Sequence, residues 1–130
     1  MIAGYDMDRS PWYVARLRIN GRVIPGKAKS GGYCCLMYNG IQVQVSSFEV
    51  LCHHGLRVWW QSGRNGLIPP EGLTIGIDSV NNERVFMGRH VHVGVLCVGI
   101  LDANHSCLRA LFDGNEERFP FYDVLCGQPE

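Results

Sequence analysis

Histidine and cysteine side chains in the C-terminal half suggest the first chemistry. His90 and His92 are two residues apart, so in a β-strand they would lie on the same face. His105 and Cys107 have the same spacing in the next segment, and on a neighbouring strand these four could supply the nitrogen and sulfur ligands of a metal site. The chain has no His-x-x-x-His or Cys-x-x-Cys pair. Partly buried histidines are therefore the favoured interpretation, and no metal or cofactor is expected.

Motifs that identify common enzyme classes are absent. The sequence contains no Gly-x-Ser-x-Gly elbow, Walker loop, dinucleotide fingerprint or His-Glu-x-x-His motif. A Cys–His nucleophile pair assembled in space stays open, because its two members need not be close in sequence. Nothing in the sequence favours such a pair, so we expect a protein that is not an enzyme.

Composition limits the environments and partners of the chain. Its 130 residues fit one domain, and 12 Lys and Arg residues balance 12 Asp and Glu residues. Without a basic excess to neutralise phosphates, nucleic acid is not an expected partner. No long apolar run is present, so no membrane insertion is expected. The start of the chain lacks the pattern of a secretion signal, and this predicts a cytoplasmic protein with six reduced cysteines, with release by a route that needs no signal peptide left open.

Two stretches of the sequence resemble each other, and together they define the elements that must position any site. Four residue pairs are each separated by 73 positions: Arg16 and Arg89, Gly21 and Gly94, Gly26 and Gly99, Cys34 and Cys107. Val50-Leu51-Cys52 then matches Val124-Leu125-Cys126 at a spacing of 74, which places one inserted residue between Asp113-Gly114 and Phe121. We therefore predict one domain over residues 1–130, with a first repeat over about 4–52, a connector over about 53–75 and a second repeat over about 76–126.

The local pattern is that of antiparallel strands. Residues 13–19 alternate and end at Asn20-Gly21, and residues 33–38 end at Asn39-Gly40 before a clean alternation over 41–45. Asn-Gly between strand-like segments is a strong hairpin signal, because both turn residues need positive φ. No segment has a sustained helical period. The predicted fold is all-β, with two pseudo-symmetric antiparallel units forming one compact domain.

The ordered set of repeated residues resembles a known family. The first copy contains Tyr13-Val14-Ala15-Arg16, Ile24-Pro25-Gly26-Lys27, Tyr38-Asn39-Gly40 and Phe48-Glu49-Val50-Leu51, and the second contains Phe86-Met87-Gly88-Arg89 and Tyr122-Asp123-Val124-Leu125. This pattern, which spans nearly the whole chain, is similar to the DM-nine (DM9) tandem repeat. The resemblance implies a mannose-binding lectin of innate immunity that is all-β, made without a signal peptide and typically a homodimer.

The resemblance also implies which side chains bind sugar. An Asp near the start of each repeat and the Lys of Pro-Gly-Lys correspond to Asp6 and Lys27 in the first copy. In the second copy Asp78 fills the Asp position, whereas Ile100 replaces the Lys. A family glutamate after the hairpin turn corresponds to Gln42 in the first copy and to Glu116 in the second. Each copy therefore lacks one member of the implied set, and the first pocket is the better candidate.

Other polar and aromatic residues have structural interpretations. Arg16 of the first copy has a counterpart, Arg89, in the second copy, which lost its Lys. We therefore predict a structural role for both arginines, such as holding a carboxylate or a carbonyl between the halves. Trp12, Trp59 and Trp60 could offer a stacking face for a sugar, although core packing is favoured for each. Trp59 and Trp60 are adjacent and should point to opposite faces of a strand.

Two functions of different class remain as sequence-based hypotheses. The leading one is a carbohydrate-binding lectin that recognises mannose-type glycans, with a homodimer supplying multivalency for a weak site. The alternative is a protein-interaction or scaffold module that kept the fold and lost the sugar. A function that depends on thiols or metal through Cys97, Cys107 and the histidines is the weakest option.

Overall fold

The structure is a computed structural model that describes all residues from 1 to 130, and nearly all of its regular structure is β-sheet. The predicted all-β fold is confirmed, with one 3-10 turn at Ala103–His105 as the exception. The first six strands are β1 (Ile2–Tyr5), β2 (Pro11–Ile19), β3 (Arg22–Lys29), β4 (Tyr33–Tyr38), β5 (Ile41–Val45) and β6 (Glu49–Val50). The others are β7 (Leu56–Arg64), β8 (Thr74–Asp78), β9 (Glu83–His92), β10 (Val95–Asp102), β11 (Cys107–Phe112), β12 (Asn115–Phe119) and β13 (Phe121–Pro129).

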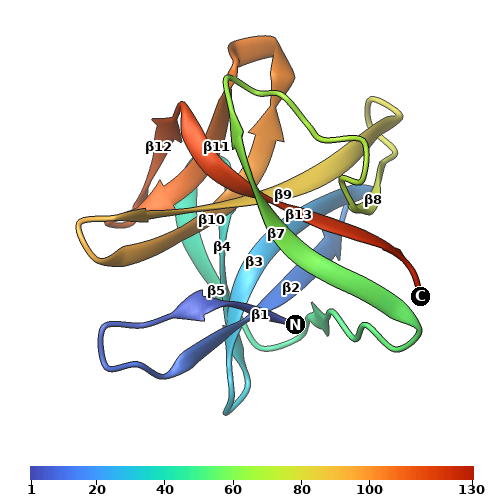
Figure 1. The fold of residues 1–130 in the computed structure, drawn as a ribbon. Helices are drawn as coiled ribbons and strands as arrows, with labels where there is room; N and C mark the ends of the chain where they lie inside the picture. The colour runs from blue at the N-terminus through green and yellow to red at the C-terminus, as the bar shows by residue number, and fades with distance from the viewer.

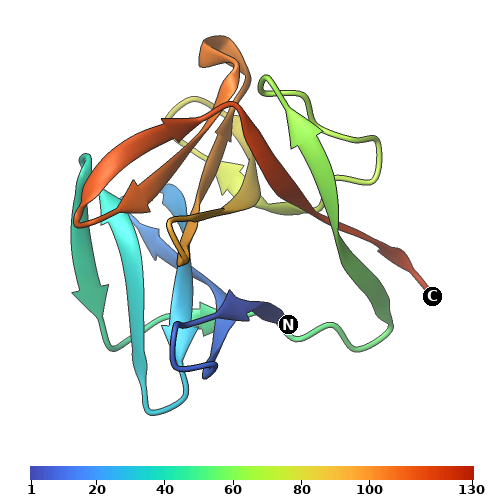
Figure 2. The ribbon, with the colours of Figure 1, turned by 60° about the vertical axis from the view of Figure 1, so that its left-hand side comes forward.

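The strands form one curled antiparallel sheet in the order β1-β2-β3-β4-β5-β12-β11-β10-β9-β13-β7 (Figure 1). Outside this path, β6 pairs with β2 and β8 pairs with β9. The two halves of the sheet meet at a single residue pair, Asn115 on β12 with Ile41 on β5. Figure 2 shows how the curl turns the β4–β5 hairpin towards the β11–β12 hairpin. No helix in the structure has the length and apolar character needed to cross a membrane.

The repeat in the sequence is a repeat in the structure. Strands β1 to β6 recur in the same pairing scheme as β8 to β13, and β7 is an added strand that pairs with β13. The strand pairs β1–β2 and β8–β9 even share an irregularity at the same place, between Ile2 and Gly4 and between Thr74 and Gly76. Such matched bulges indicate that both copies bend the sheet in the same way.

Strand register corrects the predicted place of the inserted residue. Lys29 pairs with Tyr33 across β3 and β4, whereas Asp102 pairs with Cys107 across β10 and β11. The connection therefore gains its residue at Ala103–Ser106, before β11, and not after Asp113-Gly114 as predicted. Cys107 consequently occupies the place of Tyr33 rather than that of Cys34. The match of two cysteines in the sequence was a coincidence that shifted the apparent insertion by several residues.

The predicted hairpin turns are confirmed by their backbone angles. Asn20 and Asn39 have φ of 51° and 54°, and the glycines that follow them have φ of 78° and 79°. Positive φ at both central residues gives a turn whose twist matches that of the strands. The β9–β10 turn has the same geometry with Val93 at φ 50°, a conformation that β-branched side chains disfavour.

Three hydrophobic clusters make up the interior, and the central one belongs to both repeats. It combines Trp12, Val14 and Val23 of the first repeat with Ile75, Met87, Leu96 and Leu125 of the second. The other two clusters each lie within one repeat. Because each half of the chain contributes to the central cluster, neither half can bury its apolar surface alone.

Two arginines tie the repeats together by reciprocal contacts. The Arg16 guanidinium bonds Glu49 within its own repeat (3.1 Å) and the carbonyl of Ile75 in the other. Arg89 bonds Asp123 within its repeat (3.0 Å) and the carbonyl of Ala3 in the other (2.8 Å). This confirms the structural role predicted for the two arginines. Each satisfies a carbonyl beside a bulge that the sheet ladder leaves free.

Trp59 and Trp60 lie on opposite faces of β7, as predicted. Trp60 packs against the central cluster, and Trp59 packs against the cluster of the second repeat. The Arg89 guanidinium lies 4.4 Å from the centroid of the Trp60 ring, so β7 covers one of the two arginine contacts.

Candidate functional site

Two of the predicted sugar residues line a basin of about 620 Å³ where the hairpins of the two repeats face each other. We call it the Lys27 basin. Polar and aromatic groups from both repeats line it, including Trp12, Lys27, Tyr33, Gln42, Gln44 and Asp113. Two of the predicted residues, Lys27 and Gln42, therefore lie in one site. The basin exists because the curl of the sheet brings β3, β4 and β5 opposite the β11–β12 turn (Figure 2).

Lys27 is held in the basin by contacts on two sides. Its ammonium donates to the carbonyl of Leu96 on β10 (2.8 Å) and lies 4.5 Å from the centroid of the Trp12 ring. Burial lowers the pKa of Lys27. An ammonium has three donors, so two N–H groups are left for a ligand after the bond to Leu96.

Asp6 contacts a different lysine from the one expected. Its carboxylate lies 3.1 Å from the ammonium of Lys29, and no ion pair joins Asp6 to Lys27. Lys29 also donates to the hydroxyl of Ser10 and lies 4.5 Å from the Trp12 ring centroid. The Met7 backbone N–H and the Lys29 ammonium hold the pKa of Asp6 below its usual value. The implied Asp–Lys arrangement is thus a cluster of one carboxylate and two ammonium groups around Trp12.

The aromatic surface of the basin is Tyr33 rather than Trp12. Trp12 is 6% exposed and the two lysines cover its ring, which confirms core packing as its role. Tyr33 packs edge-on against it with ring centroids 6.1 Å apart, and it is 37% exposed. A sugar ring entering the basin would meet the tyrosine face, where its C–H groups can pack.

Side-chain amides and a carboxylate complete the polar lining. The amide groups of Gln42 and Gln44 lie 3.8 and 3.9 Å from the sulfur of Cys35, so both point to the basin side of the sheet. Asp113, in the β11–β12 turn of the other repeat, is exposed and makes no ion pair. Together the two amides and the carboxylate offer hydrogen-bond donors and acceptors at several positions in the basin, and vicinal hydroxyl groups require both.

The corresponding region of the second repeat is occupied by its own charges. Ile100 stands in the place of Lys27 and packs against the central cluster. Its cross-strand partner Arg109 pairs with Glu116 (3.2 Å) and Asp102 (3.3 Å). The Asp78 carboxylate accepts from the Val80 backbone N–H (2.9 Å). Glu116 is thus engaged by Arg109, and no lysine is present to complete the implied set.

His90, His92 and the five buried cysteines have packing roles, whereas the exposed His105 pairs with Asp102 (2.7 Å). The ring of His90 stacks on Phe119 with centroids 4.4 Å apart, and His92 packs edge-on against Phe112 at 4.7 Å. His90 and His92 do share a strand face, at 6.1 Å, but no three His, Cys, Asp or Glu residues converge as metal ligands would. All six cysteines are free, and burial raises the pKa of Cys34 to about 12. Such a thiol stays protonated and is a poor nucleophile.

Sequence reasoning missed four residues of the site. Lys29 shares a strand face with Lys27, and Gln44 shares one with Gln42, so a period of two could have found both. Tyr33 lies at the start of the hairpin strand that follows. Asp113 comes from the other repeat and left no local signal, because only the curl of the sheet brings it near Lys27.

Comparison with known proteins agrees with this fold. The sequence matches the DM9 repeat over residues 6–119. No curated protein matches the sequence. Among solved structures, the nematode sperm cell motility protein MFP2B has a similar fold, with a TM-score of 0.62 at 15% sequence identity. The similarity covers 99% of this chain and 40% of that protein's chain.

Proposed function

Because this chain belongs to the DM9 repeat family, we propose that it is a lectin-like protein that binds carbohydrate in the Lys27 basin. The observation that carries the proposal is the ammonium of Lys27, fixed by the Leu96 carbonyl beside Gln42, Gln44 and Asp113. Charged donors make stronger hydrogen bonds than neutral ones, so Lys27 would be the main anchor for a pair of sugar hydroxyls. The exposed ring of Tyr33 would contact the apolar face of the sugar.

The finer part of the proposal is a mannose-type glycan bound without catalysis, in a role in innate recognition. An open basin with few charged groups favours a weak site, so a homodimer that presents two basins would be needed for tight attachment to a cell surface. Neither nucleic acid nor a membrane interior is proposed as a partner. The proposed compartment is the cytoplasm, with release by a route that needs no signal peptide.

Retention on immobilised mannose, followed by elution with free mannose, tests the proposal. Wild-type protein should be retained, and Lys27→Met should elute with the unbound fraction, because methionine keeps most of the apolar stem and removes the donors. The matched control is Arg118→Met, since Arg118 is an exposed cation of the second repeat at the place that corresponds to Gln44. The control should bind as the wild type does.

A second variant sharpens the test of this site. Gln42→Glu introduces the glutamate that the family pattern implies and places a carboxylate in the same basin as Lys27. We expect later elution from mannose for this variant. Retention that survives Lys27→Met would move the site elsewhere, and a folded wild-type protein that binds no sugar on a broad glycan screen would overturn the proposal.

The occupied second repeat favours one alternative, a protein-interaction module that lost sugar binding. Glu116 and Asp102 are both engaged by Arg109, so that copy has kept its strands without an open polar site. The solved structure with a similar fold carries the name of a motility protein, not of a lectin. Under this alternative Lys27→Met would leave every interaction of the protein unchanged.

A further inference from the structure

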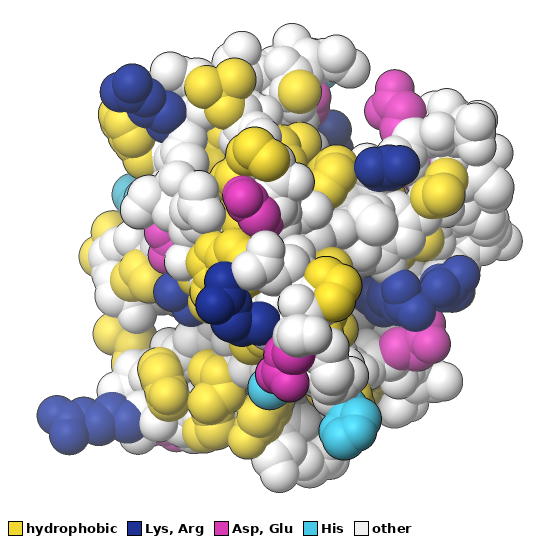
Figure 3. Space-filling view, turned by 45° about the vertical axis from the view of Figure 1, so that its right-hand side comes forward, with side chains coloured by type: hydrophobic (Ala, Val, Ile, Leu, Met, Phe, Trp, Pro, Cys, Tyr) yellow, Lys and Arg dark blue, Asp and Glu magenta, His cyan; other side chains and the backbone are white.

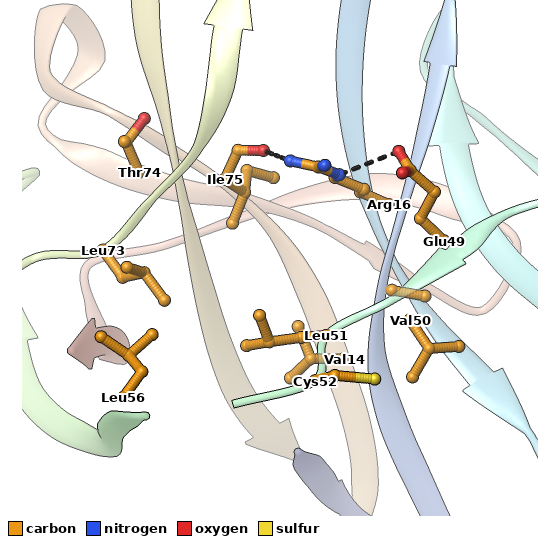
Figure 4. A pocket seen from close by; sticks show the side chains of 11 residues that line it. Val14, Arg16, Glu49, Val50, Leu51, Cys52, Leu56, Leu73, Thr74 and Ile75 are labelled. Atoms are coloured by element: carbon orange, nitrogen blue, oxygen red, sulfur yellow. Dashed lines mark hydrogen bonds and ion pairs between the residues drawn. The ribbon is translucent and has the colours of Figure 1, made fainter. Parts of the chain in front are cut away.

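A second concavity, away from the Lys27 basin, lies where the first repeat meets β8. It has a volume of about 330 Å³, and eight of its eleven lining residues are hydrophobic. Leu51, Leu56, Leu73 and Ile75 form its apolar walls, and the Arg16–Glu49 pair closes one side (Figure 4). We call it the Arg16 cleft. Its apolar walls and single cation favour a hydrophobic ligand rather than a sugar.

The second repeat contains the same arrangement, but there it is filled. Arg89 corresponds to Arg16, Leu125 to Leu51 and Ala3 to Ile75, and β7 lies over them. The Trp60 ring lies 4.4 Å from the Arg89 guanidinium, and its indole N–H donates to the carbonyl of Ile2 (3.1 Å). The molecule therefore shows which group fits this site when a strand covers it: an indole on an extended chain.

The first repeat lacks a strand equivalent to β7. The strand β6 pairs with β2 and has no partner on its other edge, whereas the corresponding β13 pairs with both β9 and β7. No aromatic ring lies over the guanidinium of Arg16, although four other cations of the protein have one. Thr74, which corresponds to Ile2, lines the cleft. The groups that hold Trp60 in one repeat thus have unoccupied counterparts in the other.

We propose that the Arg16 cleft binds a tryptophan side chain carried on an extended segment of a partner protein. The guanidinium of Arg16 complements the negative face of an aromatic ring. The backbone at Thr74 corresponds to the acceptor of the Trp60 indole, and the open edge of β6 can accept a short strand, as in β-augmentation. On the face of the molecule drawn in Figure 3, hydrophobic side chains gather in several patches, and Lys and Arg side chains lie beside them.

A peptide taken from the protein itself is the best probe. The nonapeptide with the sequence of β7, Leu56–Arg64, contains the indole that fills the counterpart site. Titration into ¹⁵N-labelled protein should shift the amide signals of Leu51 and Ile75 and the Nε–H signal of Arg16 until saturation. The same peptide with leucine in place of the residue corresponding to Trp60 should bind about tenfold more weakly, because the cation–π contact and the indole hydrogen bond are lost.

Two variants make the result decisive. Arg16→Lys keeps the positive charge but loses the planar face, so the nonapeptide should bind several-fold more weakly. Trp60→Ala should open the counterpart site, and N-acetyltryptophanamide should then shift the signals of Ala3 and Leu125. These signals are distinct from those of the Lys27 basin, so a failure here is separate from a failure to bind mannose.

Three outcomes would overturn the proposal. The first is no saturable shift in the Arg16 cleft with the nonapeptide. The second is equal affinity for the leucine peptide, which would show that the ring contributes nothing. The third is tight binding of N-acetyltryptophanamide that the nonapeptide does not exceed, which would assign the cleft to a small aromatic molecule instead of a partner strand.

Discussion

The two repeats share the contacts that hold the halves together and differ in the groups that face solvent. Arg16 and Arg89 make the same pair of bonds, each to a carboxylate of its own repeat and a carbonyl of the other. By contrast, Lys27 faces a basin while Ile100 at the same place packs inward. A contact that both copies need to complete their sheet ladders is fixed by the fold, whereas a solvent-facing position is free to differ.

In the second repeat the cation lies on β11 instead of on β10, the strand that corresponds to β3. Ile100 replaces the lysine, and Arg109 stands directly opposite it on β11, where the first repeat has Cys35 opposite Lys27. From β11 the guanidinium pairs with both Glu116 and Asp102. A small change of position therefore separates a cation available to a ligand from one consumed by its neighbours.

The largest expected difference between the repeats is at their matched glycines. A Cβ at Gly99 would lie 1.9 Å from the carbonyl oxygen of Arg109, so β10 and β11 would have to separate. A Cβ at Gly26 would meet the sulfur of Cys34 at 2.6 Å and the Cys35 carbonyl at 2.8 Å, where a side chain can share the adjustment. We expect Gly99→Ala to lower the free energy of unfolding by about 3 kcal/mol or more, and Gly26→Ala by about 1–2 kcal/mol.

Urea unfolding followed by circular dichroism measures both changes. Gly127→Ala is the control, because a Cβ there meets its nearest neighbours at an ordinary 3.4 Å. Equal losses at Gly26 and Gly99 would contradict the view that the second repeat packs this strand pair more closely.

A smaller difference is expected at the arginine contacts. Arg89→Met removes the hydrogen bond to the carbonyl of the buried Ala3, the ion pair with Asp123 and the stacking on Trp60. Hydrogen bonds to charged groups and a cation–π contact together predict a loss of about 3 kcal/mol in unfolding free energy. Arg16→Met, which has no ring to lose, should cost about 1–2 kcal/mol.

The same urea measurement separates the two arginines. Arg22→Met serves as the control, because Arg22 is exposed and makes no ion pair, and it should change stability by less than about 0.5 kcal/mol. If Arg16→Met proved as costly as Arg89→Met, the ring of Trp60 would contribute nothing to the difference. Such a result would count against the proposed binding of a tryptophan over Arg16, because that proposal is based on the contact between Arg89 and Trp60.

The smallest expected effect lies at the hairpin tips and has the opposite sign. Val93 adopts φ 50° and is 78% exposed, whereas Asn20 adopts φ 51° at the matching turn. Asparagine adopts this conformation with little strain, whereas the β-branched valine is strained in it, so Val93→Asn should raise the unfolding free energy by about 1 kcal/mol. The reciprocal Asn20→Val should lower it by a similar amount. Thermal unfolding of the two variants and of the double variant, which should resemble wild type, checks this prediction.

Local rules in the sequence were sufficient for much of the fold. Asn20-Gly21 and Asn39-Gly40 specify their turns through positive φ, and the alternation of Ile41, Val43 and Val45 specifies a strand with one buried face. The repeated arginines were recognised because they occur in both copies. These features depend on neighbours in the chain, or on a comparison within it.

The position of the inserted residue could not be obtained in this way. In sequence, Cys107 aligns with Cys34, but in the sheet it pairs with Asp102 and so stands where Tyr33 stands. Register follows from which backbone groups bond across the strands, and a chance identity of side chains can displace it by one residue.

The sequence alone was enough for the strands over 13–19, 33–38 and 41–45, the Asn-Gly turns, the repeat, and the two residues of the Lys27 basin, Lys27 and Gln42, that belong to the implied site. Tertiary structure alone decided that Asp6 pairs with Lys29, that Asp113 of the other repeat faces the basin, and that β7 fills one arginine site and leaves the other open. The physical reason is the separation along the chain over which each kind of interaction acts. Turn geometry and side-chain alternation act over a few residues, whereas these contacts join segments that only the curl of the whole sheet brings within reach.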